Sequence, residues 1–172
     1  MWNLSRIDAG FDRQGLVTFG VSLPQARYPD AQAAAAVYER MLNELRKLPG
    51  VQGVAAMSGL PPLRNVNAND TDIGNYTAPP EGPYENVDYY QNVMTGYFET
   101  MGIPIVQGRS FQAGDATATG LVAIVNETLV QTFWKDLNPL GQQLKPSGPP
   151  GIPWFTVIGV AKDVKQGGLD QK

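Results

Sequence analysis

The first regular pattern in the chain is an alternation of apolar and polar residues over 17–23, which is typical of a half-buried strand. Asp30 then provides an N-cap for a helix. The apolar positions of that helix recur three or four residues apart, at Val37, Met41, Leu45 and Leu48. Pro49-Gly50 ends the helix, and residues 51–57 predict a second strand. The order strand, helix, strand favours a unit whose helix crosses one face of a sheet.

Residues 61–86 have no apolar period and are rich in Pro, Gly, Asn and Asp, which predicts an irregular connector. A connector of this length in a compact chain is usually functional or mobile. The sequence therefore predicts a first lobe at 1–60, the connector at 61–86 and a second lobe at 87–172.

The second lobe alternates short strands with short helices. Strands are expected at 87–93, 103–107, 121–125, 142–144 and 154–161. Thr95 is expected to cap a helix at 96–101 that Gly102 closes in the left-handed conformation, and Asn126 is expected to cap the next helix. Because the strand at 121–125 is apolar on both faces, we expect it to be central in its sheet. These elements predict an α+β fold.

The composition excludes several classes of function. With 42% apolar and 17% charged residues, the 172-residue chain is an ordinary globular protein. A net charge of −3 and scattered Lys and Arg offer no basic surface to nucleic acid. The chain lacks Cys and His, which excludes Ser-His-Asp and Cys-His catalysis and zinc sites built on those ligands. Phosphate-binding loops of the GxxxxGK[ST] or GxGxxG type are also absent from the sequence.

No stretch of the sequence reaches the roughly 20 apolar residues needed to span a bilayer. Residues 1–10 also lack the apolar centre of a signal peptide. Composition alone leaves two interpretations open, a complete cytoplasmic protein or a fragment whose targeting segment was left behind.

Asp70 and Asp72 lie in the connector among the asparagines Asn67, Asn69 and Asn75. Calcium accepts such oxygen ligands, but the spacing does not match an EF-hand loop and lacks its final Glu. Dense Asn and Asp in a connector ordinarily serve turns, and we favour that interpretation. We expect no catalytic, cofactor-binding or metal residue, and the partner-binding residues are unknown.

Tyrosines gather around the connector and the start of the second lobe, at Tyr76, Tyr84, Tyr89, Tyr90 and Tyr97. Tyrosine is favoured at protein interfaces and sugar-binding surfaces because it buries a large area at small entropic cost. The simpler interpretation places Tyr89 or Tyr90 in the core by strand alternation and leaves the others on loops, and we favour it. Trp134 and Trp154 are expected in the core.

A series of short motifs runs in order along nearly the whole chain. The most specific is Tyr97-Phe98-Glu99-Thr100-Met101-Gly102-Ile103-Pro104, continued by residues 107–111. The others are at 4–12, 22–24, 48–51, 59–62, 122–127, 133–134, 138–141 and 157–164. Together they resemble the MacB-like periplasmic core domain of ABC transporter permeases, within the FtsX-like permease group and its acidobacterial-type subgroup. None of these motifs is a catalytic signature.

The resemblance implies a place and an architecture for the chain. Such permeases have a membrane helix, then this domain on the periplasmic face of the membrane, then further membrane helices. The domain is expected to have a porter-like βαβ lobe near the membrane and an inserted mixed α/β second lobe farther out. In the family the chain then returns to the first lobe with a strand and a helix, so the resemblance implies that the first lobe is incomplete here.

The resemblance also implies partners. These are the rest of the permease, its ATPase subunit, a periplasmic adaptor or cargo protein, and a second copy in the full transporter. We therefore expect a non-catalytic domain that couples ATP-driven motion of membrane helices to handling of a substrate or partner outside the membrane.

Two other classes of function stay open at this point. A stand-alone extracellular binding module for peptide, glycan or lipid would be favoured by a concave, Tyr-lined cleft between the lobes. A carboxylate-dependent hydrolase would need two acids that converge in one pocket with separated pKa values.

Overall fold

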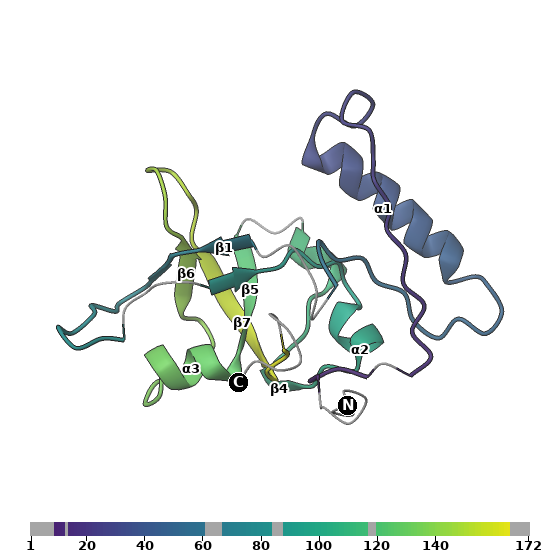
Figure 1. Cartoon of the computed structure of the whole chain (residues 1–172). Helices are drawn as coiled ribbons and strands as arrows, with labels where there is room; N and C mark the ends of the chain where they lie inside the picture. The colour runs from purple at the N-terminus through teal and green to yellow at the C-terminus, as the bar shows by residue number, and fades with distance from the viewer. Residues whose placement is uncertain (1–8, 13, 61–66, 84–87, 117–119, 166–172) are drawn as a thin grey trace, which may run out of the picture.

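The structure is a computed structural model that describes residues 9–12, 14–60, 67–83, 88–116 and 120–165. In chain order the elements are α1 (Ala31–Leu45), β1 (Asn67–Asn69), β2 (Thr71–Ile73), β3 (Asp88–Tyr90), α2 (Tyr97–Met101), β4 (Ile105–Gly108), the 3-10 helix η2 (Ala113–Ala116), β5 (Leu121–Asn126), α3 (Glu127–Phe133), β6 (Gln143–Pro146) and β7 (Phe155–Ala161). Figure 1 shows α1 to one side of the strands and α3. Helices combined with a mainly antiparallel sheet confirm the predicted α+β class.

The strand β7 is the centre of a five-stranded sheet. On one edge β5 runs parallel to it, with Leu121 opposite Phe155 and Asn126 opposite Ala161. The other edge is shared by two antiparallel strands, β6 beside the start of β7 and β4 beside its end. The strand β2 then extends the sheet beyond β6. The expectation that 121–125 is central is wrong, because β5 pairs with β7 alone among the described strands and Leu121 is 45% exposed.

A bulge in β7 turns two of its valines toward one core. Ala123 lies opposite Val157, but Ile124 lies opposite Gly159, so β7 carries an extra residue between them. Val157 and Val160 are consequently buried in the same cluster. That cluster joins the sheet to α3 and the residue after it, and consists of Ile73, Val125, Val130, Trp134, Leu144, Val157 and Val160.

The helix predicted for the first lobe is confirmed as α1, and Asp30 accepts a hydrogen bond from Ala33 N at 2.7 Å as its N-cap. The two strands expected beside it are absent. Residues 16–23 run without a turn next to α1 (Figure 1), but pair with no described strand. Within 51–57, Met57 alone forms a bridge, with Val93. A strand requires a hydrogen-bonded neighbour. The described residues supply none for 16–23 and only this single bridge for 51–57, so the porter-like lobe stays a prediction.

The connector contains strands that its composition did not predict. β1 pairs antiparallel with β3, and β2 pairs antiparallel with β6 at the edge of the main sheet. Thr71 and Ile73 are 1% and 3% exposed. Burial of these two side chains outweighs the turn-forming tendency of the neighbouring Asn and Asp. The division of the chain into two lobes stays a prediction.

The remaining short elements are close to expectation. Strands β4, β6 and β7 form where 103–107, 142–144 and 154–161 predicted them, with shifted ends, and the strand expected at 87–93 shortens to β3. Gly102 ends α2 in the left-handed conformation, at φ 63°. The predicted Thr95 cap is wrong, because Gly96 occupies the N-cap position and provides no side-chain bond.

Candidate functional site

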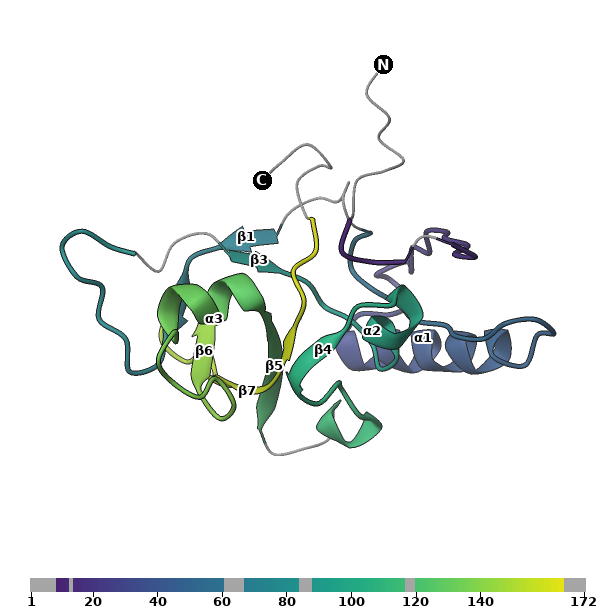
Figure 2. The ribbon, with the colours of Figure 1, turned by 90° about the horizontal axis from the view of Figure 1, so that it is seen from below.

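The first and last described segments of the chain lie side by side. Lys165 N donates to the carbonyl oxygen of Ala9 at 3.1 Å, and Asp12 N donates to that of Met101 at 2.9 Å. Figure 2 shows the purple start and the yellow end of the described chain close together. We call residues 9–12, 101–102 and 163–165 the junction. The segment that begins at residue 9 is therefore bonded both to the end of α2 and to the residues that follow β7.

Glycine makes the close approach at the junction possible. Gly10 has a φ of 81°, in the left-handed region that favours Gly. A Cβ at this position would collide with the carbonyl oxygen of Asp163 and lie 2.9 Å from Cα of Val164. A Cβ on Gly102 would lie 3.0 Å from Cβ of Asp12. The junction has no room for a side chain at Gly10 and little at Gly102.

Asp163 joins the junction to α3. Its Oδ1 accepts hydrogen bonds from Asn126 Nδ2 at 2.7 Å and from Thr128 N at 3.1 Å. Its Oδ2 accepts from Thr128 Oγ1 at 2.7 Å. Asn126 in turn accepts from Leu129 N at 3.2 Å, which confirms it as the N-cap of α3. The carboxylate thus fixes the start of α3 to the residues that follow β7.

A second hydrophobic cluster fills the space around the junction. Its buried members are Tyr97 and Met101 of α2, with Ile103 and Ala161. Half-buried residues from three regions pack against them: Phe11 and Leu16 near the start, Ala55, Met57 and Leu60 after α1, and Val93, Phe98, Ile105, Ile124 and Val164 beyond the connector. One apolar cluster therefore contacts the entry segment, the segment after α1 and the main sheet.

Arg109, directly after β4, and Asp115 of η2 form a bidentate ion pair. Arg109 Nη1 and Nη2 donate to the two carboxylate oxygens at 2.8 and 2.7 Å. The bond from Arg109, aided by Gln112 N at 2.8 Å, lowers the pKa of Asp115 from 3.8 to about 2. The two charged groups bond to each other. We therefore interpret the pair as fixing the conformation of the loop, and not as a general acid or base.

A second polar group lies at the outer edge of the sheet. Ser147 Oγ donates to Asp72 Oδ1, and Lys145 Nζ lies 2.9 Å from Asp72 Oδ2. The Ser147 bond, followed by Lys145, lowers the pKa of Asp72. Lys145 also lies 5.2 Å from the ring centre of Trp154. Trp154 is 41% exposed, so the expectation that it lies in the core is wrong.

The calcium hypothesis gains no support from this arrangement. Both carboxylate oxygens of Asp72 already have partners, and the side chains of Asn67 and Asn69 lie outside the described residues. In the parts of the chain that the structure describes, no group of three or more acidic side chains converges as a metal site would require. The favoured turn interpretation holds for Asn75, which has a φ of 60°.

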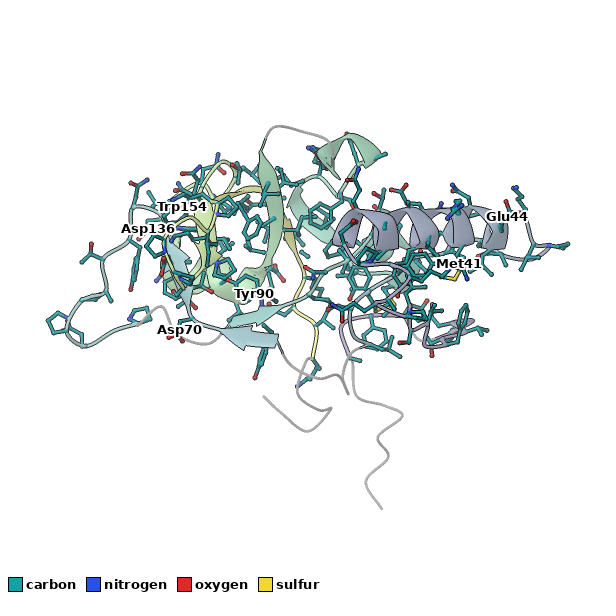
Figure 3. The ribbon with its side chains drawn as sticks, turned by 90° about the horizontal axis from the view of Figure 1, so that it is seen from above. Met41, Glu44, Asp70, Tyr90, Asp136 and Trp154 are labelled. Carbon is teal, nitrogen blue, oxygen red and sulfur yellow. The ribbon has the colours of Figure 1, made fainter. Side chains whose placement is uncertain are left out.

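The tyrosines do not converge on one surface. Tyr97 is buried in the second cluster, whereas Tyr76 and Tyr90 pack against the first, and Tyr90 shares a part-buried hydrogen bond of 2.6 Å with Thr71. Tyr76 donates to the carbonyl oxygen of Pro83 at 2.6 Å. Figure 3 shows Tyr90 among the strands and Trp154 at the outer edge of the group. Tyr89 is exposed, as alternation with Tyr90 predicted, and Tyr84 lies outside the described residues.

Sequence reasoning missed the residues that build the junction. Gly10 and Asp163 occur in two of the motifs, but nothing in their local sequence shows that they meet. No helix among the described residues is long and apolar enough to cross a membrane. The contacts of the junction hold the fold together, so the candidate site is a structural one.

Residues 4–171 match the family of MacB-like periplasmic core domains. The periplasmic region of MacB from Actinobacillus actinomycetemcomitans is similar in structure, with a TM-score of 0.53 and 21% identity, over 73% of this chain and 50% of that one. The extracellular domain of the noncanonic ABC-type transporter YknZ from Gram-positive bacteria has a TM-score of 0.51 and 19% identity, over 73% of this chain and 57% of that one. No curated protein sequence matches the chain significantly.

These solved structures support the fold, and the chain spans only 50% and 57% of their lengths. The family match is broader, since it includes the entry segment, both predicted lobes and the motif at 157–164. The chain therefore belongs to the MacB-like periplasmic core domains, which are the extracytoplasmic domains of ABC transporter permeases.

Proposed function

We propose that this domain carries movement of the membrane helices of an ABC transporter permease to a substrate or partner outside the membrane, without catalysing a reaction. The observation that carries the proposal is the junction, where the entry segment contacts the end of α2 and the residues that follow β7. In a permease of this family the segment before residue 9 leads from a membrane helix. A displacement of that helix would therefore reach the domain at the junction first.

The contacts around the junction favour movement of the domain as a rigid body, because any other movement would break them. Pulling the entry segment away would break the bonds of Asp12 and Lys165 and expose Phe11 and Leu16. Each broken backbone bond costs about 1 kcal/mol, and exposing each apolar side chain costs about 1–2 kcal/mol because both are only partly buried. A tilt of the whole domain avoids all of these losses, so we expect movement without internal rearrangement.

The rival hypothesis, a stand-alone binding module, depends on a binding surface that is complete without the membrane. Among the described tyrosines of this group, Tyr76 and Tyr90 pack against the first cluster and Tyr97 is buried in the second, so these three side chains serve packing. Coupling needs a different feature, namely contacts that differ between two states of the transporter. The two hypotheses are therefore separated by asking whether the domain moves when nucleotide binds to the ATPase partner.

The test uses a permease carrying this domain, reconstituted with its ATPase subunit in lipid nanodiscs. The domain has no cysteine, so Glu44→Cys accepts a single fluorescent donor once any cysteines in the rest of the permease and in the ATPase subunit have been replaced by Ser. Glu44 lies at the far end of α1 (Figure 3), with its side chain 72% exposed. Energy transfer to labelled lipid headgroups should change between the nucleotide-free and ATP-bound states. Equal transfer in both states would refute the proposal.

A second label decides whether the domain moves as one body. Asp136→Cys places the donor in the loop after α3, at the other side of the domain from Glu44 (Figure 3). Both donors should respond to ATP at the same nucleotide concentration, because the junction and its cluster join their parts of the fold. A response of one donor alone would contradict rigid movement.

A further inference from the structure

The segment that follows α1 is paired with the segment that leads into α2. Ser58 N donates to the carbonyl oxygen of Asn92, and Met94 N donates to that of Ala56, both at 2.9 Å. The two bonds flank a single antiparallel bridge. Asn92 N also donates to Ser58 Oγ at 3.1 Å. These bonds fix the end of the first predicted lobe to the start of the second.

A part-buried side chain and apolar packing strengthen this pairing. Gln91 Nε2 donates to the carbonyl oxygen of Gly59 at 2.6 Å. We call residues 53–59 together with residues 91–96 the seam. Three of its half-buried side chains pack against the second hydrophobic cluster, namely those of Ala55, Met57 and Val93. The seam is thus bonded along its length and joined to the cluster that surrounds the junction.

The seam continues onto α2 itself. A Cβ on Gly53 would lie 3.0 Å from Oγ1 of Thr100, and one on Gly96 would lie 3.5 Å from the carbonyl oxygen of Val54. At the opposite end of the helix, Met101 accepts the hydrogen bond that joins it to the entry segment. Helix α2 is therefore contacted at its start by the segment after α1 and at its end by the entry segment.

Arg46 joins the end of α1 to the seam. Its Nη1 donates to Asn43 Oδ1 in the last turn of the helix at 2.8 Å, and its Nη2 donates to the carbonyl oxygen of Val54 at 3.5 Å. Residues 46–52 alone separate α1 from the seam. A bonded route therefore leads from α2 through the seam to α1.

We propose that the seam carries movement from α2 to α1, and that Gln91 is a positioning residue for this transfer. The proposal rests on the proposed function, since movement must first reach α2 at the junction. Separation of α1 from α2 would break the hydrogen bonds of the seam and expose Met57 and Val93. Helix α1 therefore follows α2 as part of the same body.

Cysteine pairs test the pairing itself in the 172-residue chain, which has no cysteine of its own. Met57→Cys with Val93→Cys should form a disulfide on mild oxidation, because directly opposed residues of this type have Cα atoms about 4.5 Å apart. Ala55→Cys with Val93→Cys is the matched control. It should oxidise much more slowly, since diagonal positions are about 7–8 Å apart.

A broken seam tests the transfer in the reconstituted permease. Ser58→Pro removes both the backbone donor and the hydroxyl, and Gln91→Ala removes the side-chain bond. In this double variant the ATP-dependent change in energy transfer should persist for the Asp136→Cys donor and be largely lost for the Glu44→Cys donor. Gln107→Ala is the control for Gln91→Ala. This exposed side chain makes no hydrogen bond to a described residue, so both donors should respond as before.

Two further variants separate transfer from folding. Gln91→Ala alone should reduce the response of the Glu44→Cys donor in the same direction, and it provides the test if the double variant does not fold. The disulfide between positions 57 and 93, formed before the donor is attached, should restore that response in the double variant. A purely structural role of Gln91 would lower the response of both donors equally.

The outcomes distinguish this proposal from the proposed function. An undiminished response of the Glu44→Cys donor with the seam broken would overturn the proposal, and so would equal losses at both donors or equal oxidation of the two cysteine pairs. If neither donor responds to ATP in the permease with an intact seam, the proposed function is refuted and the transfer through the seam falls with it.

Discussion

Removing the Asp163 carboxylate should loosen α3 from the end of β7. Asp163→Ala deletes one carboxylate that accepts three hydrogen bonds, at 2.7, 3.1 and 2.7 Å. The site is exposed, so Asn126 and Thr128 regain water after the substitution, and each bond contributes about 0.5–1 kcal/mol net. We therefore expect a loss of about 2 kcal/mol in the free energy of unfolding, comparable to loss of a strong helix N-cap.

The isosteric variant separates geometry from charge. Asp163→Asn keeps Oδ1, which accepts from Asn126 and Thr128 N, and its amide can donate to Thr128 Oγ1. It should cost less than about 1 kcal/mol. Asp136→Ala is the matched control, because this exposed carboxylate makes no hydrogen bond to a described residue, and it should change stability by less than about 0.5 kcal/mol.

Urea unfolding followed by tryptophan fluorescence measures these differences. Trp134 follows α3 directly and is 2% exposed, so its emission reports loss of the core beneath the helix. Adding Thr128→Val to Asp163→Ala should cost less than the sum of the two single effects, since they share bonds. Equal stability of Asp163→Ala and Asp136→Ala would refute the role assigned to Asp163.

Three further predictions follow from buried or paired groups. Arg109 and a backbone N–H hold the pKa of Asp115 at about 2, so the stabilisation from this ion pair is complete above about pH 4 and is lost as the pH falls through 2. Arg109→Met should return the pKa of the Asp115 carboxyl toward 3.8 in an NMR titration. An unchanged pKa would exclude the pairing. The indole N–H of Trp134 is buried without a partner in the described residues. Trp134→Phe should therefore lower the free energy of unfolding in urea by only about 1 kcal/mol or less, because removal of an unsatisfied donor offsets the loss of packing. A loss above about 3 kcal/mol would contradict this. Gly10→Ala should lower the free energy of unfolding by about 2 kcal/mol or more, and with it the thermal midpoint by several degrees. Gly114→Ala is the control, since a Cβ at that position meets no atom within 4 Å, and it should leave the midpoint nearly unchanged. Equal midpoints would show that the junction tolerates a side chain.

Features encoded by a few neighbouring residues were predictable. Asp30 and Asn126 are N-caps, and Gly102 closes α2, because each conformation depends on residues within about one helical turn. The central position of β7 was not predictable from its apolar run, since β5 has an equally apolar sequence. What distinguishes β7 is that both of its edges are paired.

The other differences between the predictions and the structure also arise from contacts between residues that are far apart in the sequence. Residues 17–23 alternate as a strand should, but strand formation needs a neighbour that the described residues do not provide. Thr71 and Ile73 form β2 within an Asn-rich and Asp-rich region because the main sheet buries them. The junction was invisible for the same reason, since Gly10 and Asp163 stand at opposite ends of the sequence.

The central claim is that movement enters this domain through the junction. Its most direct test compares the ATP-dependent energy-transfer change of the Glu44→Cys donor in nanodiscs with and without Gly10→Ala, while ATP hydrolysis is measured in the same samples. We predict that hydrolysis continues and that the change in energy transfer is largely lost when Gly10 is replaced. An undiminished change in the Gly10→Ala transporter would contradict the account.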